Sequence, residues 1–187
     1  MTTQPQASVP TLTPITACRL LGEEAARALP PYLHFVTEPK LFAGRALVLS
    51  VFAGTQALDE MLREVCNDRV VVVDAQCQTH TAFIGPSQLK LAMAGKARAL
   101  LVLGAICNPA KLKKDAGIPI VAMGTTPRMA PSDDGVLRRY RCFTDIGAIL
   151  DEGPKHTAPG DSIVGSEAGL VVAKTALVRT VFGDHAV

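Results

Sequence analysis

Two short apolar runs place the strongest constraint on the fold of this chain. Val70–Val73 reads VVVV and Ala99–Leu103 reads ALLVL, and neither run alternates apolar with polar residues. Strands without alternation are covered on both faces, as in parallel sheets that are packed on both sides. Between the runs lies a helix-like segment that opens on Gly85-Pro86 and closes on Gly95. The order strand, helix, strand predicts a βαβ unit at the centre of an α/β domain.

Further elements are expected on both sides of this unit. Apolar residues at helical spacing and turn residues at helix ends predict helices at Cys18–Leu29, Ala57–Val65, Pro109–Asp115 and Lys174–Val181. Short apolar runs predict strands at Ala46–Phe52, Ile120–Met123 and Ile146–Leu150, and a hairpin that pairs Ser162–Val164 with Leu170–Val172. Turn residues predict a turn at Pro39–Gly44 and loops at Thr125–Gly135 and Asp151–Pro159. The polar, proline-punctuated segment 1–14 is expected to be flexible. The length of 187 residues then suits a single domain over residues 15–187.

Composition excludes several classes of partner. A net charge of +2, with no long run of Lys and Arg, argues against direct nucleic-acid binding and against a membrane surface. No apolar run approaches the roughly 18 residues needed to span a bilayer. The five scattered cysteines form no C-x-x-C pair, so we expect reduced thiols in a cytoplasmic protein. Since 48% of the residues are hydrophobic and only 19% are charged, some apolar surface is expected to lie between subunits.

The start of the central helix is the first candidate site. Gly85 suits the N-cap position, and Pro86 suits the first helical position because its missing N–H would be unpaired there. Ser87 and Gln88 then present free backbone donors, which favour a small anion such as a carboxylate or a phosphate. The alternative is an ordinary helix start that binds only water.

Other candidate residues have common structural roles as well. Asp74 follows a predicted strand and Asp161 follows a Pro-Gly pair, where an aspartate can serve a site or can cap a turn. Cys107 is a possible nucleophile, although no residue near it in sequence would activate it. The four histidines, His34, His80, His156 and His185, are widely separated, and lone histidines are most often surface residues. The common nucleotide, hydrolase and zinc motifs are absent.

The ordered series of motifs resembles a known family. FAGRALVLSVF, RVVVVDA, the central helix start, LLVLGAICN, IPIVAMG, PGD and AGLVV follow one another between Phe42 and Val178. This series is similar to the regulator of ribonuclease activity A (RraA-like) family, whose relatives include class II 4-hydroxy-4-methyl-2-oxoglutarate aldolases. The resemblance implies a swivelling β/β/α-type domain with a central sheet flanked by helices. It also implies a ring-shaped homotrimer with an anion pocket between neighbouring subunits.

The resemblance also shows where this sequence departs from the aldolases. Their Gly-Asp helix start corresponds to Gly85-Pro86-Ser87-Gln88. Their Gly-x-x-Arg-Asp turn, which supplies an arginine clamp and a metal-site aspartate, corresponds to Gly104–Asn108 with Cys107 and Asn108 in the charged positions. Loss of the carboxylate weakens Mg²⁺ or Mn²⁺ binding, so we expect a degenerate metal site at Asn108. Cys107 cannot replace an arginine that grips a carboxylate. Lys111, Lys113 and Arg98 are the cations that remain as possible substitutes.

Two functions remain from different classes. The first is a non-catalytic regulator that binds a protein partner, by resemblance a ribonuclease, with no cofactor. The second is a divalent-metal-dependent aldolase or oxaloacetate decarboxylase that uses Mg²⁺ or Mn²⁺. We favour the regulator, with no catalytic residue, because the lyase needs the two side chains that Cys107 and Asn108 replace. A small anion or carboxylate remains a possible ligand of the helix start in either case.

Overall fold

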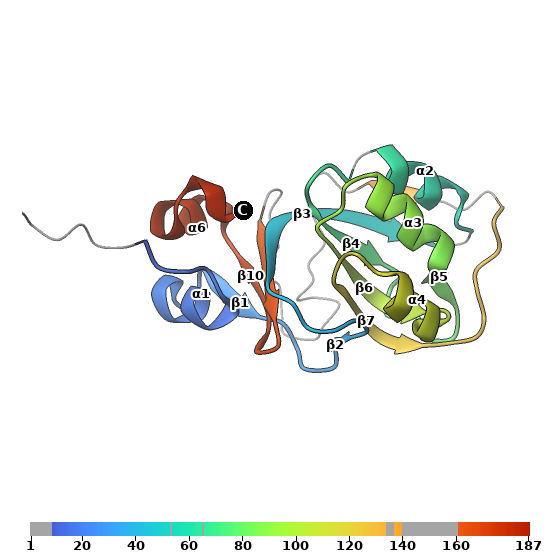
Figure 1. Ribbon diagram of the computed structural model, residues 1–187, viewed down its shortest axis with the longest axis horizontal. Helices are drawn as coiled ribbons and strands as arrows, with labels where there is room; N and C mark the ends of the chain where they lie inside the picture. Colours follow the sequence, from blue (N-terminus) through green and yellow to red (C-terminus); the bar gives the residue numbers. More distant parts are fainter. Residues whose placement is uncertain (1–8, 53, 65, 134–136, 140–160) are drawn as a thin grey trace, which may run out of the picture.

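The computed structural model describes residues 9–52, 54–64, 66–133, 137–139 and 161–187. Figure 1 shows two sheet regions joined by one long strand, with helices on the two outer faces. This is a mixed α/β fold with a central sheet flanked by helices, as the sequence predicts. None of the described helices has the length and apolar content needed to cross a bilayer.

A parallel sheet forms one half of the fold. Its strands are β3 (Phe42–Val51), β4 (Val70–Asp74), β6 (Ala99–Ile106) and β7 (Ile120–Thr125), in that spatial order. Val70 pairs with Ala46 on one side and with Ala99 on the other, so the two apolar runs are neighbouring parallel strands. The predicted βαβ unit is therefore confirmed.

Both faces of this sheet are buried, which explains why its strands do not alternate. Val71 and Val73 pack beneath helices α2 (Gln56–Glu64), α3 (Pro86–Ala94) and α4 (Pro109–Asp115). Val70 and Val72 point to the opposite face, into a cluster that includes Ile163 and Leu170 of the second sheet. Every residue of β4 and β6 is buried. A polar residue facing either side would therefore lose its contact with water.

A smaller antiparallel sheet forms the other half. It contains β1 (Ala26–Ala28), β10 (Gly169–Ala173) and β9 (Ser162–Ser166), and β9 pairs with the first part of β3. Residues 42–45 of β3 pair with β9, whereas residues 46–50 pair with β4. The long strand β3 thus passes from one sheet region into the other (Figure 1). The predicted hairpin at β9 and β10 is confirmed, with two additional residues on each strand.

Helices α1 (Pro14–Leu21) and α6 (Thr175–Phe182) cover the outer face of the hairpin (Figure 1). Ala17 and Val178 pack there against Val164 and Val171. The predicted helix at Cys18–Leu29 is wrong in its boundaries. It begins earlier, at Pro14 with Thr13 as its N-cap, and it ends at Leu21, because the C-cap Gly22 has a φ of +76°, outside the helical region. The chain then forms β1, because residues 26–28 complete the edge of the hairpin sheet.

Several short elements were not predicted. Strands β2 (His34–Phe35), β5 (Ala82–Ile84) and β8 (Leu137–Arg139) have two or three residues each, too few to give a periodic pattern. Strand β3 begins at Phe42, inside the predicted turn 39–44. Leu12 and Pro14 are buried, so the end of the segment predicted to be flexible contributes to the core. The predicted strand 146–150 and loop 151–159 lie outside the described residues.

Candidate functional site

The carboxyl ends of the parallel strands bring several turns together. The Cys107 N–H donates to the Ile84 carbonyl at 2.9 Å, which places the turn after β6 beside the start of α3. The Thr126 N–H donates to the Ile106 carbonyl at 2.9 Å, which adds the turn after β7. The two candidate motifs, Gly85–Gln88 and Cys107–Asn108, therefore lie at the same edge of the sheet, where open α/β sheets bind ligands.

One backbone N–H at the start of α3 is hydrogen-bonded to a side chain of the same helix. Gly85 is the N-cap in an extended conformation, and its N–H donates to Gln88 Oε1 at 3.2 Å. Gln88 is only 5% exposed, and its Nε2 donates to Asp59 Oδ1 of helix α2 at 2.9 Å. The Ser87 and Gln88 amides lie in the first turn, where an α-helix offers them no carbonyl four residues earlier. Ser87 is exposed, so its side of the helix start faces solvent.

Asn108 has a structural role in the turn after β6. Its backbone is left-handed, with φ +56° and ψ +60°, a conformation that asparagine tolerates better than most residues. Its side-chain Oδ1 accepts the Lys111 N–H at 3.2 Å and so caps helix α4. Asn108 itself is exposed, and Cys107 is half-buried, with Sγ 3.7 Å from the Pro127 carbonyl oxygen.

Gly104 is required by a close approach within β6. A Cβ atom at this position would lie 2.8 Å from Ala75 Cβ and 2.9 Å from the Gln78 carbonyl oxygen. The turn after β4 therefore packs directly on the backbone of β6, and any larger residue at position 104 would push this turn away from the strand. The glycine of the Gly104–Asn108 turn is thus explained by packing alone.

A pocket of about 360 Å³ opens beside this turn, with three residues of the β6–α4 turn on one side and three of the turn after β7 on the other. Its described lining consists of Cys107, Asn108, Pro109, Thr125, Thr126 and Pro127. None of these six residues carries a charge. In the described part of the chain, no group of three or more His, Cys, Asp and Glu side chains is placed to hold a metal ion. The side chains that line this pocket do not fit a divalent cation, which prefers carboxylate oxygens.

Comparison with known families places the fold. The model of the RraA-like family, described as Aldolase/RraA, matches residues 17–172. The chain belongs to the RraA-like family.

Solved structures support the same fold. The RNA-processing inhibitor RraA from Thermus thermophilis is 20% identical, with a TM-score of 0.72 over 88% of this chain and 94% of that one. RraAS2 from Streptomyces coelicolor, described as an unusual member of the RNase ES inhibitor RraA protein family, is 23% identical, with a TM-score of 0.73 over 91% and 85%. A structure from Geobacillus kaustophilus HTA426, named as an S-adenosylmethionine: 2-dimethylmenaquinone methyltransferase, is 19% identical, with a TM-score of 0.72 over 87% and 95%.

The two candidate aspartates of this RraA-like chain have structural partners. Asp74 is 6% exposed; its Oδ2 accepts the Ser50 hydroxyl at 2.9 Å, and its Oδ1 accepts the Gln76 N–H at 2.8 Å. It therefore fixes the turn after β4, in which Gln76 and Cys77 both have positive φ angles. Asp161 is 4% exposed and pairs with Lys174 Nζ at 2.9 Å, at the far end of the hairpin sheet from its turn. These contacts match the turn-forming and structural roles described for buried aspartates.

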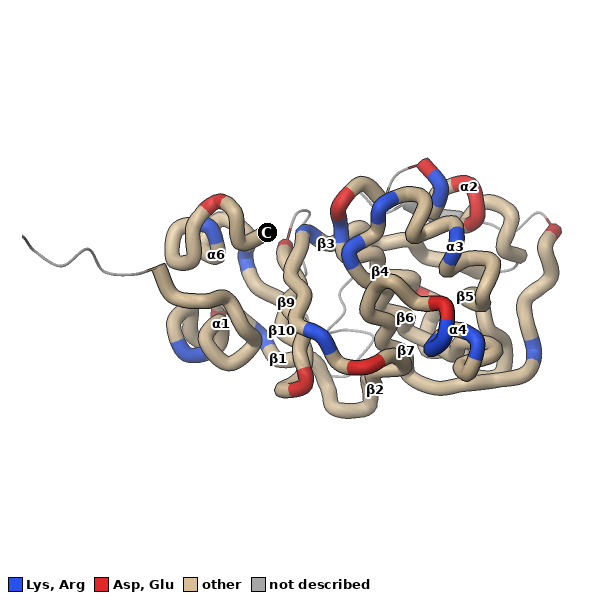
Figure 2. The backbone as a smooth tube through the Cα atoms, viewed as in Figure 1, with Lys and Arg blue, Asp and Glu red and all other residues tan. Residues whose placement is uncertain are grey.

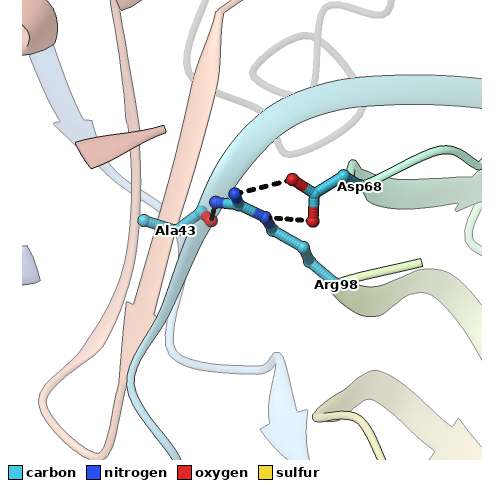
Figure 3. Close-up of polar contacts among 3 residues, drawn as sticks. All are labelled: Ala43, Asp68 and Arg98. Carbon is cyan, nitrogen blue, oxygen red and sulfur yellow. Dashed lines mark hydrogen bonds and ion pairs between the residues drawn. The ribbon is translucent and has the colours of Figure 1, made fainter. Parts of the chain in front are cut away.

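The three cations considered as substitutes for an arginine clamp have different positions. Arg98 precedes β6, so it lies at the opposite end of the sheet from Cys107. There it forms two bonds with Asp68, at 2.7 and 2.8 Å, and donates to the Ala43 carbonyl at 2.7 Å (Figure 3). Arg98 is therefore excluded as a substitute. Lys111 pairs with Asp115 at 2.9 Å along helix α4, on which Figure 2 shows residues of both charges. Lys113 lies on the same helix and is exposed, but it is not among the described residues that line the pocket beside Cys107.

Residues from the turn after β7 line the pocket, a role that the predicted surface loop at 125–135 does not include. Thr125, Thr126 and Pro127 supply half of the described lining. The signal that would have found them is positional, since a turn that follows a parallel strand lies at the same sheet edge as its neighbours. The four candidate residues of the α3 start do not line this pocket directly, although they adjoin it through Ile84.

Proposed function

We propose that this RraA-like protein is a non-catalytic regulator that acts by binding a protein partner. One observation carries the proposal: the turn that supplies an arginine and a metal-site aspartate in the aldolase relatives here contains Cys107 and Asn108. Asn108 directs its side-chain oxygen to the Lys111 amide and so caps helix α4. The residues at this turn therefore support the fold without providing the charges that the lyase reaction needs.

The absence of an arginine and a metal-site aspartate at this turn argues against lyase activity. A carboxylate held by an arginine gains charge-assisted hydrogen bonds of roughly 1.5 to 3 kcal/mol each, and Cys107 offers no comparable donor. Divalent cations in such sites are held through carboxylates and water, and Asn108 brings no negative charge. Neither Arg98 nor Lys111 compensates, because both pair with aspartates elsewhere.

The second candidate is a metal-dependent aldolase or oxaloacetate decarboxylase. It is favoured by the pocket of about 360 Å³ at the sheet edge, which is large enough for a small oxo-acid. The exposed side of the α3 start would add backbone donors for a carboxylate. This function would need a Mg²⁺ or Mn²⁺ site assembled from residues other than the pocket lining.

The proposed regulator has a cytoplasmic setting and a trimeric form. The names of two similar structures refer to inhibition of RNA processing and of RNase ES, which suggests a ribonuclease as the partner of this chain also. A homotrimer would bury part of the apolar surface that its composition implies. Binding of a small anion at the α3 start remains compatible with either function.

Two measurements on the full chain test the proposal. Turnover of oxaloacetate and of 4-hydroxy-4-methyl-2-oxoglutarate is followed while Mg²⁺ or Mn²⁺ is titrated, and a regulator is expected to show only background rates. Binding of purified ribonucleases from the source organism is then measured by surface plasmon resonance. Saturable, metal-dependent turnover would refute the proposal that the protein is non-catalytic. Absence of ribonuclease binding would rule out a ribonuclease as its partner.

A further inference from the structure

A second pocket lies between helix α4 and the outer edge of the parallel sheet. Its volume is about 490 Å³, and it is lined by residues of β2, β7 and α4: His34, Phe35, Val36, Pro109, Ala110, Lys113, Ala122, Gly124 and Thr125. It shares Pro109 and Thr125 with the pocket beside Cys107, so the two hollows adjoin. Most of its described lining is apolar, and none of the described lining residues is acidic. We call it the β2–α4 groove.

The floor of the groove is open because it contains a glycine. A Cβ atom added at Gly124 would meet no atom within 4 Å, in contrast to Gly104 on the neighbouring strand. Ala122, two residues earlier on the same strand, adds only a methyl group. The space above β7 is therefore free, at this point, of the side chains that the structure describes, and it can accept a side chain from another molecule.

One wall of the groove is the edge of the sheet. The strand order of the described residues ends at β2, which pairs with β7 on its inner side. The Val36 N–H donates to the Ile120 carbonyl at 2.8 Å, so by the alternation of an antiparallel ladder the N–H and C=O of Phe35 point away from β7. An extended peptide could pair with this donor and acceptor, as in strand addition to a sheet edge.

The opposite wall carries positive charge. Lys113 is exposed on α4 and lines the groove, and it forms no ion pair with any residue that the structure describes. Lys111 on the same helix is already paired with Asp115. Nucleic acid would need a continuous line of cations, whereas the described groove lining offers one lysine among apolar residues. A carboxylate next to an apolar side chain complements this surface better.

We infer that the β2–α4 groove docks an extended acidic segment of a protein partner. Its backbone pairs with the free edge at Phe35, an apolar side chain fills the space above Gly124, and an Asp or Glu side chain reaches Lys113. This inference rests on the proposed function, since it names the surface and the partner chemistry of the regulator.

The test uses linear peptides and three variants of the full chain. A random library of short peptides is selected on the wild-type protein, and the affinity of the selected peptides is measured by fluorescence anisotropy. The Gly124→Leu variant fills the groove without a clash at Cβ, and Lys113→Glu reverses the charge of its wall. Lys114→Glu is the matched control, because it makes the same charge change on the same helix at an exposed residue outside the groove lining.

The selected peptides are expected to combine acidic with apolar residues. Gly124→Leu and Lys113→Glu should each weaken their binding about tenfold, while Lys114→Glu should change it about twofold or less. The inference is overturned if no such peptide is enriched, if Lys113→Glu and Lys114→Glu weaken binding equally, or if polyuridylate RNA competes for the groove. It is also overturned if Gly124→Leu alters the oligomeric mass, since the groove would then be a contact between copies. If the peptide test overturns the docking inference, the proposed regulator function still stands, unless metal-dependent turnover is also found.

Discussion

At the scale of single residues, Asn108 combines two structural roles at one position. It adopts a left-handed backbone, and its side chain caps helix α4. An aspartate could accept the same Lys111 N–H, so the cap explains the shape of the turn and not the loss of the negative charge. The loss of charge is therefore the informative difference from the aldolases, because the fold does not demand it.

The two roles of Asn108 predict different stabilities for three variants at this position. Asn108→Ala should lower the free energy of unfolding by about 1 to 3 kcal/mol, because it removes the cap and strains a left-handed residue. Asn108→Gly should cost less, since glycine adopts positive φ freely, and Asn108→Asp should stay near wild type. Urea denaturation measures all three. An Asn108→Ala variant as stable as the wild type would show that the cap contributes nothing.

The burial of the Cys66 thiol predicts that the folded protein loses stability at high pH. Burial raises the pKa of its thiol to about 11, from an ordinary value near 9.0. Since the folded pKa is the higher one, its contribution is fully present below the unfolded pKa and is lost as the pH rises from about 9 to about 11. The full contribution is about 2 to 3 kcal/mol.

The comparison variant is Cys66→Ala, which lacks this titration although it also loses packing. Urea denaturation between pH 8 and pH 11 is expected to show a steeper loss of stability in the wild type than in the variant, on the pKa difference above. Parallel pH profiles for the two proteins would contradict the burial of the Cys66 thiol.

At the scale of elements, the central strands were predictable because their signal is strong and local. Both faces of β4 and β6 are covered, so burial alone requires continuous apolar runs such as Val70–Val73. Helix α4 was also predicted with its observed bounds, 109–115, since Pro109 marks its start and Gly117 prevents its continuation. The hairpin of β9 and β10 follows from its apolar residues and from Gly165 and Gly169, which lie in the strands on either side of the turn at 167–168.

Elements that depend on distant partners were missed. Residues 26–28 continue an apparent helical pattern, yet they form β1 because β10 offers them an unpaired edge from the other end of the chain. Strands β2 and β5 exist through pairing with β7 and β6 and have too few residues to show a period. The bridge that the Gln88 side chain forms between Gly85 and Asp59 also depends on a distant partner, and the sequence predicts only a backbone donor at this position.

Arg98 links elements from both halves of the fold, as Figure 3 shows. Its bonds to Asp68 lower the pKa of that carboxyl, so the ion pair contributes stability above the ordinary pKa of an aspartate and loses it as the pH falls. Asp68 is 67% exposed, however, and exposed ion pairs contribute little. The bond to the Ala43 carbonyl is partly buried.

This difference predicts unequal effects of two substitutions. Asp68→Asn should lower the free energy of unfolding by less than about 1 kcal/mol, and the loss should shrink in high salt. Arg98→Ala should cost about 1 to 3 kcal/mol, because it also leaves the Ala43 carbonyl without its partner. Thermal or urea denaturation compares the two. Equal losses would mean that only the ion pair matters.

At the scale of the whole molecule, the two sheet regions share one strand, and three hydrophobic clusters separate four layers of elements. The helices α2, α3 and α4 lie on one side, the hairpin sheet lies on the other, and α1 with α6 covers the hairpin (Figure 1). Exposed apolar side chains remain on α1 and α6, among them Ile15, Leu20 and Leu177. Contact between copies of the chain would cover these side chains if they form one patch.

We therefore expect a homotrimer in solution, as the family resemblance implies. Light scattering coupled to size exclusion should give the mass of three copies of the 19.7 kDa chain. The mass should not fall on dilution within the micromolar range. A monomer mass would contradict the prediction and would remove the idea of a pocket between subunits.

We propose that this RraA-like protein lacks lyase chemistry because Cys107 and Asn108 stand where, by resemblance, the aldolases carry two charged residues. The most direct measurement is the rate of oxaloacetate decarboxylation as a function of Mg²⁺ concentration, for the wild type and for the double variant Cys107→Arg with Asn108→Asp. We predict background rates for the wild type at every Mg²⁺ concentration, and tighter Mg²⁺ binding by the double variant in isothermal titration calorimetry. A wild-type rate that rises with Mg²⁺ and saturates with oxaloacetate would contradict the claim.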